Sequence, residues 1–178
     1  VDEGTVAFQG RSITGMRPNQ ISHRGLLRTF QIPKLFGNMS VLDNMLVPYY
    51  ARSNPFAPRA VTTARQRAHD LIALADLSHL RDAPAKFLSG GQQALLQIAR
   101  GFMVDHLVLY LLDEPFAGVN PVIKEAINRL ILNANEDDGI TFILVSHEME
   151  QIRKLCHGVT VLAAGSVIAE GTLEEVAE

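Results

Sequence analysis

Apolar residues follow two different periods along this chain of 178 residues. Two continuous apolar runs, 107–112 and 141–145, have the length of strands, and such runs are typical of parallel strands covered on both faces. Apolar residues at helical spacing predict helices at 41–47, from Thr63, from Ser89, from Asn120 and over 148–156. Strands that alternate with helices in this way predict an α/β fold with a parallel sheet.

Shorter patterns predict additional elements near both ends of the chain. Alternating residues around Gly10 predict an opening β-hairpin, and those around Gly165 predict a second hairpin over 159–169. Between them, the pattern predicts a short helix at 19–25 and an extended segment at 26–31. Three prolines predict a loop after residue 47, and they are Pro48, Pro55 and Pro58.

Composition narrows the classes of protein that the chain can belong to. Sixteen Lys and Arg against nineteen Asp and Glu give a net charge of −3, so no basic surface for nucleic acid is indicated. The longest apolar run, 107–112, is far shorter than the roughly 20 residues that span a bilayer. One cysteine, Cys156, excludes a disulfide within the chain.

A glycine-rich segment stands where one predicted helix begins. Ser89 and Gln92 have the spacing of a capping box, and Gly90 and Gly91 lie between them. Glycines let backbone N–H groups approach an anion, and the helix N-terminus adds positive potential. The segment therefore indicates a phosphate site, although a glycine-rich turn before a capped helix has the same pattern.

Polar residues follow the predicted strands. Asp113 and Glu114 end the first apolar run, where one carboxylate can hold Mg²⁺ and the other can polarise a water. His147 follows the second run, at the end of the sheet where α/β proteins bind ligands. Solvated carboxylates and a structural histidine are the alternatives. Gln31 follows the extended segment and could reach a metal or a water.

The order and spacing of these residues resemble the nucleotide-binding domain of ABC transporters. Gln31 precedes Leu88 by 57 residues, Asp113 follows Gln92 by 21, and His147 follows Glu114 by 33. The resemblance runs over residues 1–178. It implies an α/β fold with a RecA-like P-loop NTPase layer, an antiparallel β element and a helical subdomain over about 41–102.

The resemblance also implies a role for each motif, with ATP and Mg²⁺ as cofactors. Asp113 matches the magnesium residue of Walker B, Glu114 the catalytic carboxylate and His147 the switch histidine. Gln31 matches the residue that senses the γ-phosphate and contacts the metal. The signature that binds ATP across a dimer is matched by Leu88, Ser89, Gly90, Gly91 and Gln92. Asn120 stands where an aspartate is commoner, and a helix-capping role alone explains it.

Three segments are similar to the ATPases of branched-chain amino-acid importers, namely 27–31, 35–44 and 117–121, and 167–172 is similar to the closing hairpin of the ABC family. Urea, amide and lipopolysaccharide systems have related ATPases. This likeness implies that ATP hydrolysis drives solute import. The implied partners are a second ABC ATPase subunit, in a homo- or heterodimer, transmembrane permease subunits and, indirectly, a solute-binding protein. The implied location is cytoplasmic, on the inner face of the cell membrane.

The phosphate-binding motif Gly-x-x-x-x-Gly-Lys-Ser/Thr does not occur in these 178 residues. The resemblance implies that this Walker A segment precedes residue 1, so we expect a single, N-terminally incomplete domain that does not bind ATP tightly by itself. Two alternatives stay open. A degenerate domain would only offer its signature to a partner, and a soluble ABC protein would act on ribosomes or DNA.

Overall fold

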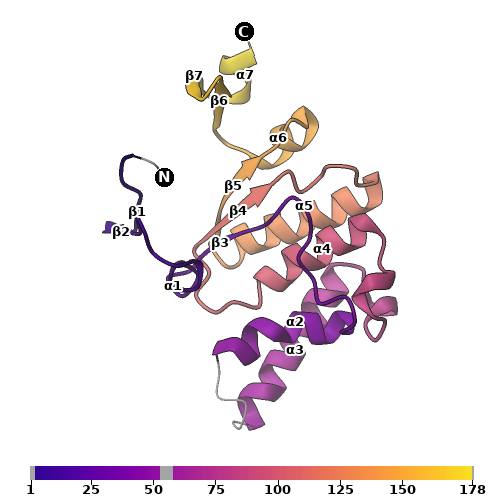
Figure 1. Cartoon of the computed structure of the whole chain (residues 1–178). Coiled ribbons are helices and arrows are strands. Elements are labelled where there is room, and N and C mark those ends of the chain that lie inside the picture. The colour runs from indigo at the N-terminus through magenta and orange to yellow at the C-terminus, as the bar shows by residue number, and fades with distance from the viewer. Residues whose placement is uncertain (1–2, 53–57, 178) are drawn as a thin grey trace.

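Three parallel strands form the centre of the structure, a computed structural model that describes residues 3–52 and 58–177. Their order is β3 (Leu26–Arg28), β4 (Leu109–Asp113) and β5 (Thr141–Val145). Because all three run in the same direction, their carboxyl ends meet at one edge of the sheet (Figure 1). This arrangement confirms the predicted α/β class and its parallel sheet.

The predicted antiparallel hairpins are confirmed and lie outside the central sheet. The opening hairpin pairs β1 (Ala7–Phe8) with β2 (Arg11–Ser12). The second pairs β6 (Val159–Ala163) with β7 (Ser166–Gly171). The short helix α1 (Pro18–Ser22) precedes β3.

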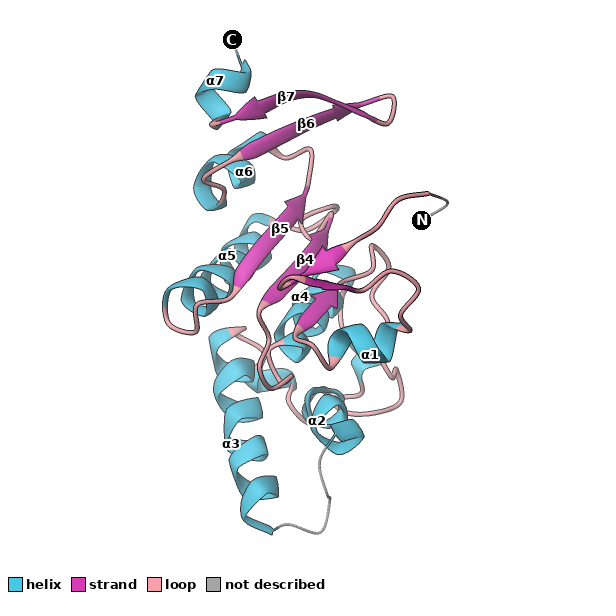
Figure 2. Ribbon diagram, turned by 90° about the vertical axis from the view of Figure 1, so that its left-hand side faces the viewer, coloured by secondary structure: helices cyan, strands magenta, loops and turns pink. Residues whose placement is uncertain are grey.

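Helices flank the sheet and form a group beside it. Figure 2 shows α4 (Gly90–Gly101) and α5 (Pro121–Glu136) on one side of the sheet. No helix among the described residues is long and apolar enough to cross a membrane. The remaining helices are α2 (Val41–Arg52), α3 (Pro58–Leu74), the 3₁₀ turns η1 (Ser78–Leu80) and η2 (Ala85–Phe87), α6 (Met149–Leu155) and α7 (Leu173–Ala177).

Both predicted helix caps are confirmed. The Ser89 hydroxyl accepts a hydrogen bond from the backbone N–H of Gln92 at 3.3 Å, and the Gln92 side chain accepts one from the Ser89 N–H at 2.9 Å. Asn120 caps α5 by accepting from the Ile123 N–H at 3.0 Å. These caps fix the residue at which each helix begins, next to the edge where the strands end.

The predicted loop at the prolines is wrong in two places. Pro48 lies inside α2, which extends to Arg52, and α3 begins at Pro58 rather than at Thr63. Proline suits the first helical position, which explains the early start of α3. Burial of apolar residues of α2, among them Met45, outweighs the cost of an internal proline, roughly 3 kcal/mol. Pro55 lies outside the described residues.

The expectation that both apolar strands are covered on both faces is also wrong for the part of the chain that the structure describes. Along β5, Phe142 and Leu144 are half-buried, whereas Ile143 and Val145 are 52% and 56% exposed. Along β4, Tyr110 and Leu112 are buried, whereas the residues that alternate with them, Leu109, Leu111 and Asp113, are half-exposed. Helices α4 and α5 cover one face only, so burial alternates along apolar strands.

We predict that Gly101→Ala destabilises the fold. A Cβ at Gly101 would overlap the Tyr110 ring, with its Cζ only 2.5 Å away, and Tyr110 is fully buried between β4 and α4. Overpacking of this kind costs about 1–3 kcal/mol, which urea denaturation would measure as a lower free energy of unfolding.

Gly90→Ala is the matched control. A Cβ at Gly90 meets nothing within 4 Å, so alanine there should leave stability equal or raise it by up to about 1 kcal/mol. Equal stability of the two variants would contradict the tight packing of α4 against β4.

Candidate functional site

Hydrogen bonds from both neighbouring strands fix the backbone where β4 ends. The Asp113 N–H donates to Oγ1 of the buried Thr29 at 3.0 Å, and the Glu114 N–H donates to the Val145 carbonyl at 2.8 Å. Thr29 in turn donates its own N–H to the Leu111 carbonyl at 2.9 Å. The two predicted carboxylates therefore stand on backbone that is tied to β3 and β5.

Asp113 faces a cation from the neighbouring strand. Its Oδ2 lies 2.9 Å from Nη2 of Arg28, and the two side chains are 30% and 62% exposed. An ion pair so open to water contributes at most about 1 kcal/mol. A cation that binds the Asp113 carboxylate more tightly than Arg28 does can therefore displace Arg28.

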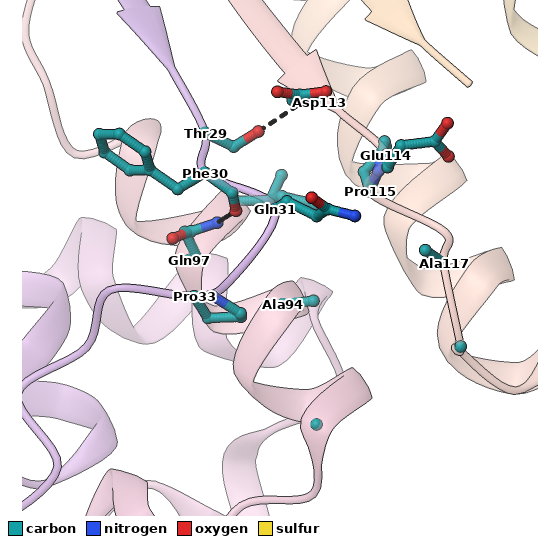
Figure 3. A pocket seen from close by; sticks show the side chains of 13 residues that line it. Thr29, Phe30, Gln31, Pro33, Ala94, Gln97, Asp113, Glu114, Pro115 and Ala117 are labelled. Carbon is teal, nitrogen blue, oxygen red and sulfur yellow. Dashed lines mark hydrogen bonds between the residues drawn. The ribbon is translucent and has the colours of Figure 1, made fainter.

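Glu114 occupies a strained backbone conformation, with φ at 47°. A non-glycine residue in this left-handed region costs of the order of 1–3 kcal/mol, and such strain gathers at functional sites. The turn directs the Glu114 carboxylate away from Gln31 (Figure 3). Its Oε1 lies 2.9 Å from Nδ1 of His147, and its buried Oε2 has no hydrogen-bond partner among residues 3–52 and 58–177.

His147 stands beside this carboxylate with 76% of its side chain exposed. The hydrogen bond to Glu114 and the charge of that carboxylate raise the pKa of His147, and the charge of Glu148 adds to the rise. Lys124 opposes it, because its ammonium repels the protonated imidazole. The Glu114 carboxylate therefore favours the protonated form of the His147 imidazole.

A cleft of about 200 Å³ lies between the end of β4, residues 29–33 and helix α4 (Figure 3). Gln31 reaches into it, toward the segment of Glu114 and Pro115. Of the predicted site residues, the cleft is lined by Gln31, Gly90, Asp113 and Glu114. The structure thus brings together residues from three distant parts of the chain.

The remaining predicted site residues do not line this cleft. Leu88 is buried, and Ser89 and Gln92 are engaged in the helix cap. Gly91 packs against the segment before α5, because a Cβ there would lie 3.4 Å from Cγ1 of Val119. The predicted site residues that do not line the cleft are Leu88, Ser89, Gly91, Gln92, Asn120 and His147.

Sequence reasoning missed three polar residues at the site. Arg28 and Thr29 contact Asp113, and Gln97 lines the cleft although it is only 7% exposed. Arg28 and Thr29 could not be found without the pairing of β3 with β4. Gln97 had a signal, since it interrupts an apolar helical stripe with an amide.

The donors at the cleft suit Mg²⁺. Asp113 offers a carboxylate and Gln31 an amide oxygen, which are the hard ligands that this ion prefers. No group of three or more His, Cys, Asp or Glu residues that could hold a metal occurs among residues 3–52 and 58–177. The site therefore fits a hydrated ion that is held partly by substrate oxygens, rather than a metal enclosed by protein.

Comparison with known proteins identifies the family of this chain. A family model described as "ABC transporter" matches residues 1–117. The chain belongs to the ABC transporter family. The probable branched-chain amino acid transport ATP-binding protein LivG of Archaeoglobus fulgidus is 36% identical over 98% of this chain and 70% of its own length. The corresponding protein BraF of Pseudomonas aeruginosa is 29% identical, over 97% and 71%.

A solved structure agrees with the ABC transporter assignment. It is a dimeric post-hydrolysis state of an ATP-binding cassette bound to ADP and Pi, 25% identical, with a TM-score of 0.80. The alignment covers 96% of this chain and 74% of that one. The family and the RecA-like ABC ATPase fold that the motifs implied are thereby confirmed, and the chain is an ABC ATP-binding subunit by relationship.

We predict that His147 titrates above its ordinary pKa of 6.5 and that Glu114→Gln lowers this pKa. The raised pKa means that the pair with Glu114 stabilises the fold below pH 6.5 and that this stability is lost as pH rises through the pKa of folded His147. NMR titration of the imidazole measures the shift.

Glu136→Gln, at an exposed position of α5, is the matched control and should leave the pKa of His147 unchanged. If Glu114→Gln also left that pKa where it was, the hydrogen bond between the two side chains would be refuted.

Proposed function

We propose that this chain is the ATP-hydrolysing subunit of an ABC importer that transports branched-chain amino acids. One observation carries the proposal: Gln31, Asp113, Glu114 and His147 follow the three neighbouring strands β3, β4 and β5 at the edge where those strands end. The names of LivG and BraF support the solute class. The dimeric cassette bound to ADP and Pi supports the nucleotide.

In this proposal, Glu114 polarises the water that attacks the γ-phosphate. Its Oε2, which has no hydrogen-bond partner in the part of the chain that the structure describes, is the oxygen left to accept a hydrogen bond from that water. Its other oxygen, Oε1, is oriented by Nδ1 of His147. The strained turn at Glu114 fixes the direction in which the carboxylate points.

His147 and Gln31 contact the γ-phosphate from two sides. The bond between Nδ1 of His147 and Glu114 leaves Nε2 as the ring atom that donates to a phosphate oxygen. Gln31 presents an amide from within the cleft, whereas His147 lies outside its lining and beside Glu114. Both side chains lie beside the end of β4, so both respond to the presence of the γ-phosphate.

Asp113 and Gln31 would hold Mg²⁺, which neutralises negative charge on the phosphates when bound. Asp113 would exchange Arg28 for the ion, since their ion pair is open to water. Until then, Arg28 keeps the negative charge of Asp113 balanced.

The signature acts on the nucleotide of a second ATPase subunit in this proposal. Ser89, Gly90 and Gly91 present the capped N-terminus of α4, whose backbone N–H groups suit an anion. Residues 41–102 form a helical subdomain that carries this segment. The partner subunit is a second copy or a homologous ATPase.

Exposed aromatic residues mark the surface for the permease. Phe36 and Phe87 are 51% and 73% exposed, and a hydrogen bond from the Lys86 N–H to the Gly37 carbonyl at 2.9 Å joins their segments. Apolar groups exposed in one place suit a protein partner. Docking of the permease there places the subunit on the inner face of the cell membrane. A solute-binding protein acts on the ATPase subunit only through the permease.

We predict that Glu114→Gln slows ATP hydrolysis at least about 10²-fold while ATP binding is retained, the usual scale for losing a general base. The assay uses an extended ATPase, in which a segment with the Walker A motif is joined ahead of residue 1. Steady-state phosphate release measures turnover, and nucleotide titration measures binding.

Glu136→Gln serves again as the matched control and should hydrolyse ATP at the wild-type rate. Wild-type turnover in Glu114→Gln would move the catalytic role to another residue.

We predict that a polypeptide of these 178 residues alone binds Mg-ATP more weakly than the low micromolar range. A Walker A loop supplies backbone N–H groups and a lysine to the phosphates, and the sequence contains no such motif. Isothermal titration calorimetry against the extended ATPase measures the difference. A low micromolar dissociation constant for the 178 residues would show that the other motifs suffice for binding.

A further inference from the structure

The segment that carries Gln31 is held at both ends by one buried side chain. Gln97 of α4 donates from Nε2 to the Phe30 carbonyl at 2.9 Å and accepts at Oε1 from the Lys34 N–H at 2.8 Å. Figure 3 shows Gln97 beneath the segment, with its bond to Phe30 drawn. Gln31 thus lies between two backbone groups that are tied to the same amide.

The amide of Gln97 suits this contact. The Phe30 carbonyl needs a donor and the Lys34 N–H an acceptor, and the glutamine amide offers both, on two separate atoms and without charge. Arg100, one turn further along α4, donates from Nη2 to the Lys34 carbonyl at 2.6 Å. Helix α4 therefore binds residues 30–34 through their backbone, independently of the loop side chains.

The residue before this segment belongs to the sheet instead. Thr29 is hydrogen-bonded to Leu111 and Asp113 of β4, whereas the next residue, Phe30, is hydrogen-bonded to Gln97 of α4. The backbone is thus held by the sheet at Thr29 and by helix α4 from Phe30 onward. The position of Gln31 relative to Asp113 is then set by how α4 lies against β4.

We propose that Gln97 is a positioning residue that fixes the Gln31 segment to α4, so that Gln31 and the helix N-terminus at Ser89 move as one body. The roles of Gln31 and Ser89 rest on the proposed function, whereas the attachment itself rests on the two hydrogen bonds. Any displacement of α4 that a partner causes at Ser89 is transmitted to Gln31.

Amide exchange in the 178-residue chain tests the attachment directly. Gln97→Leu keeps the size of the side chain and removes both bonds, so the Lys34 amide should exchange at least about tenfold faster. NMR resolves this amide, and the amide of Leu111 on β4 reports whether each variant is folded.

Gln93→Leu is the matched control. Gln93 lies on the same helix and donates to the Leu88 carbonyl at 3.0 Å, away from residues 30–34. It should leave the Lys34 amide unchanged. Wild-type exchange of the Lys34 amide in Gln97→Leu would overturn the attachment.

Hydrolysis by the extended ATPase tests the positioning role. Gln97→Leu should lower kcat more than it raises KM, since it displaces Gln31 and leaves the contacts of the other residues to bound nucleotide in place. The double variant of Gln31→Ala with Gln97→Leu should be no slower than Gln31→Ala, because residues that act through one another are not additive. Additive losses would overturn the positioning role.

An extended ATPase without activity would instead refute the proposed function. Amide exchange in the 178-residue chain would still decide whether Gln97 holds residues 30–34.

Discussion

Two backbone hydrogen bonds at the end of β4 are the constraint on which the site depends. The N–H groups of Asp113 and Glu114 donate in opposite directions, to Thr29 next to β3 and to Val145 of β5. Consecutive N–H groups that are both held in this way leave little freedom to the backbone between them. The strained φ of Glu114 and the divergence of the two carboxylates follow from this constraint.

Helix α4 is the second element that orders the site. Its N-terminus is capped by Ser89, its middle holds residues 30–34 through Gln97, and its C-terminal half packs on β4. The Tyr110 hydroxyl contacts the Gln97 and Ile98 carbonyls at 3.4 Å, which joins helix and strand beneath the cleft. One helix therefore relates the signature, the Gln31 segment and the carboxylates to one another.

The sequence predicted features that depend on local chemistry. The caps at Ser89 and Asn120 need only residues three positions apart, and the polar residues after each apolar run marked the ends of β4 and β5. These features placed the candidate site at the carboxyl edge of the sheet. The family resemblance supplied the reaction, which no single motif specified.

Features that depend on tertiary packing were not predicted. The continuation of α2 through Pro48 relies on burial of its apolar face, which local propensity does not show. The exposed face of β5 has the same residue types as a covered one. Contacts of Arg28 and Gln97 cross 85 and 67 residues of sequence, and such pairs follow from the topology alone.

In the proposed function, Asp113 and Glu114 of one subunit act with the signature of another. Gly90 lines the same cleft as both carboxylates within one chain, so action within a single subunit is the competing account. Ser89→Arg disables the signature and Glu114→Gln disables the carboxylate, and each variant of the extended ATPase should be inactive alone.

Mixing the two inactive variants decides between the accounts. Action across a dimer predicts that the mixture regains about a quarter of the wild-type rate of ATP hydrolysis, because half of randomly paired dimers then contain one intact site of two. A chain that carries both changes is the control and should stay inactive. A mixture as inactive as either variant alone would contradict the account.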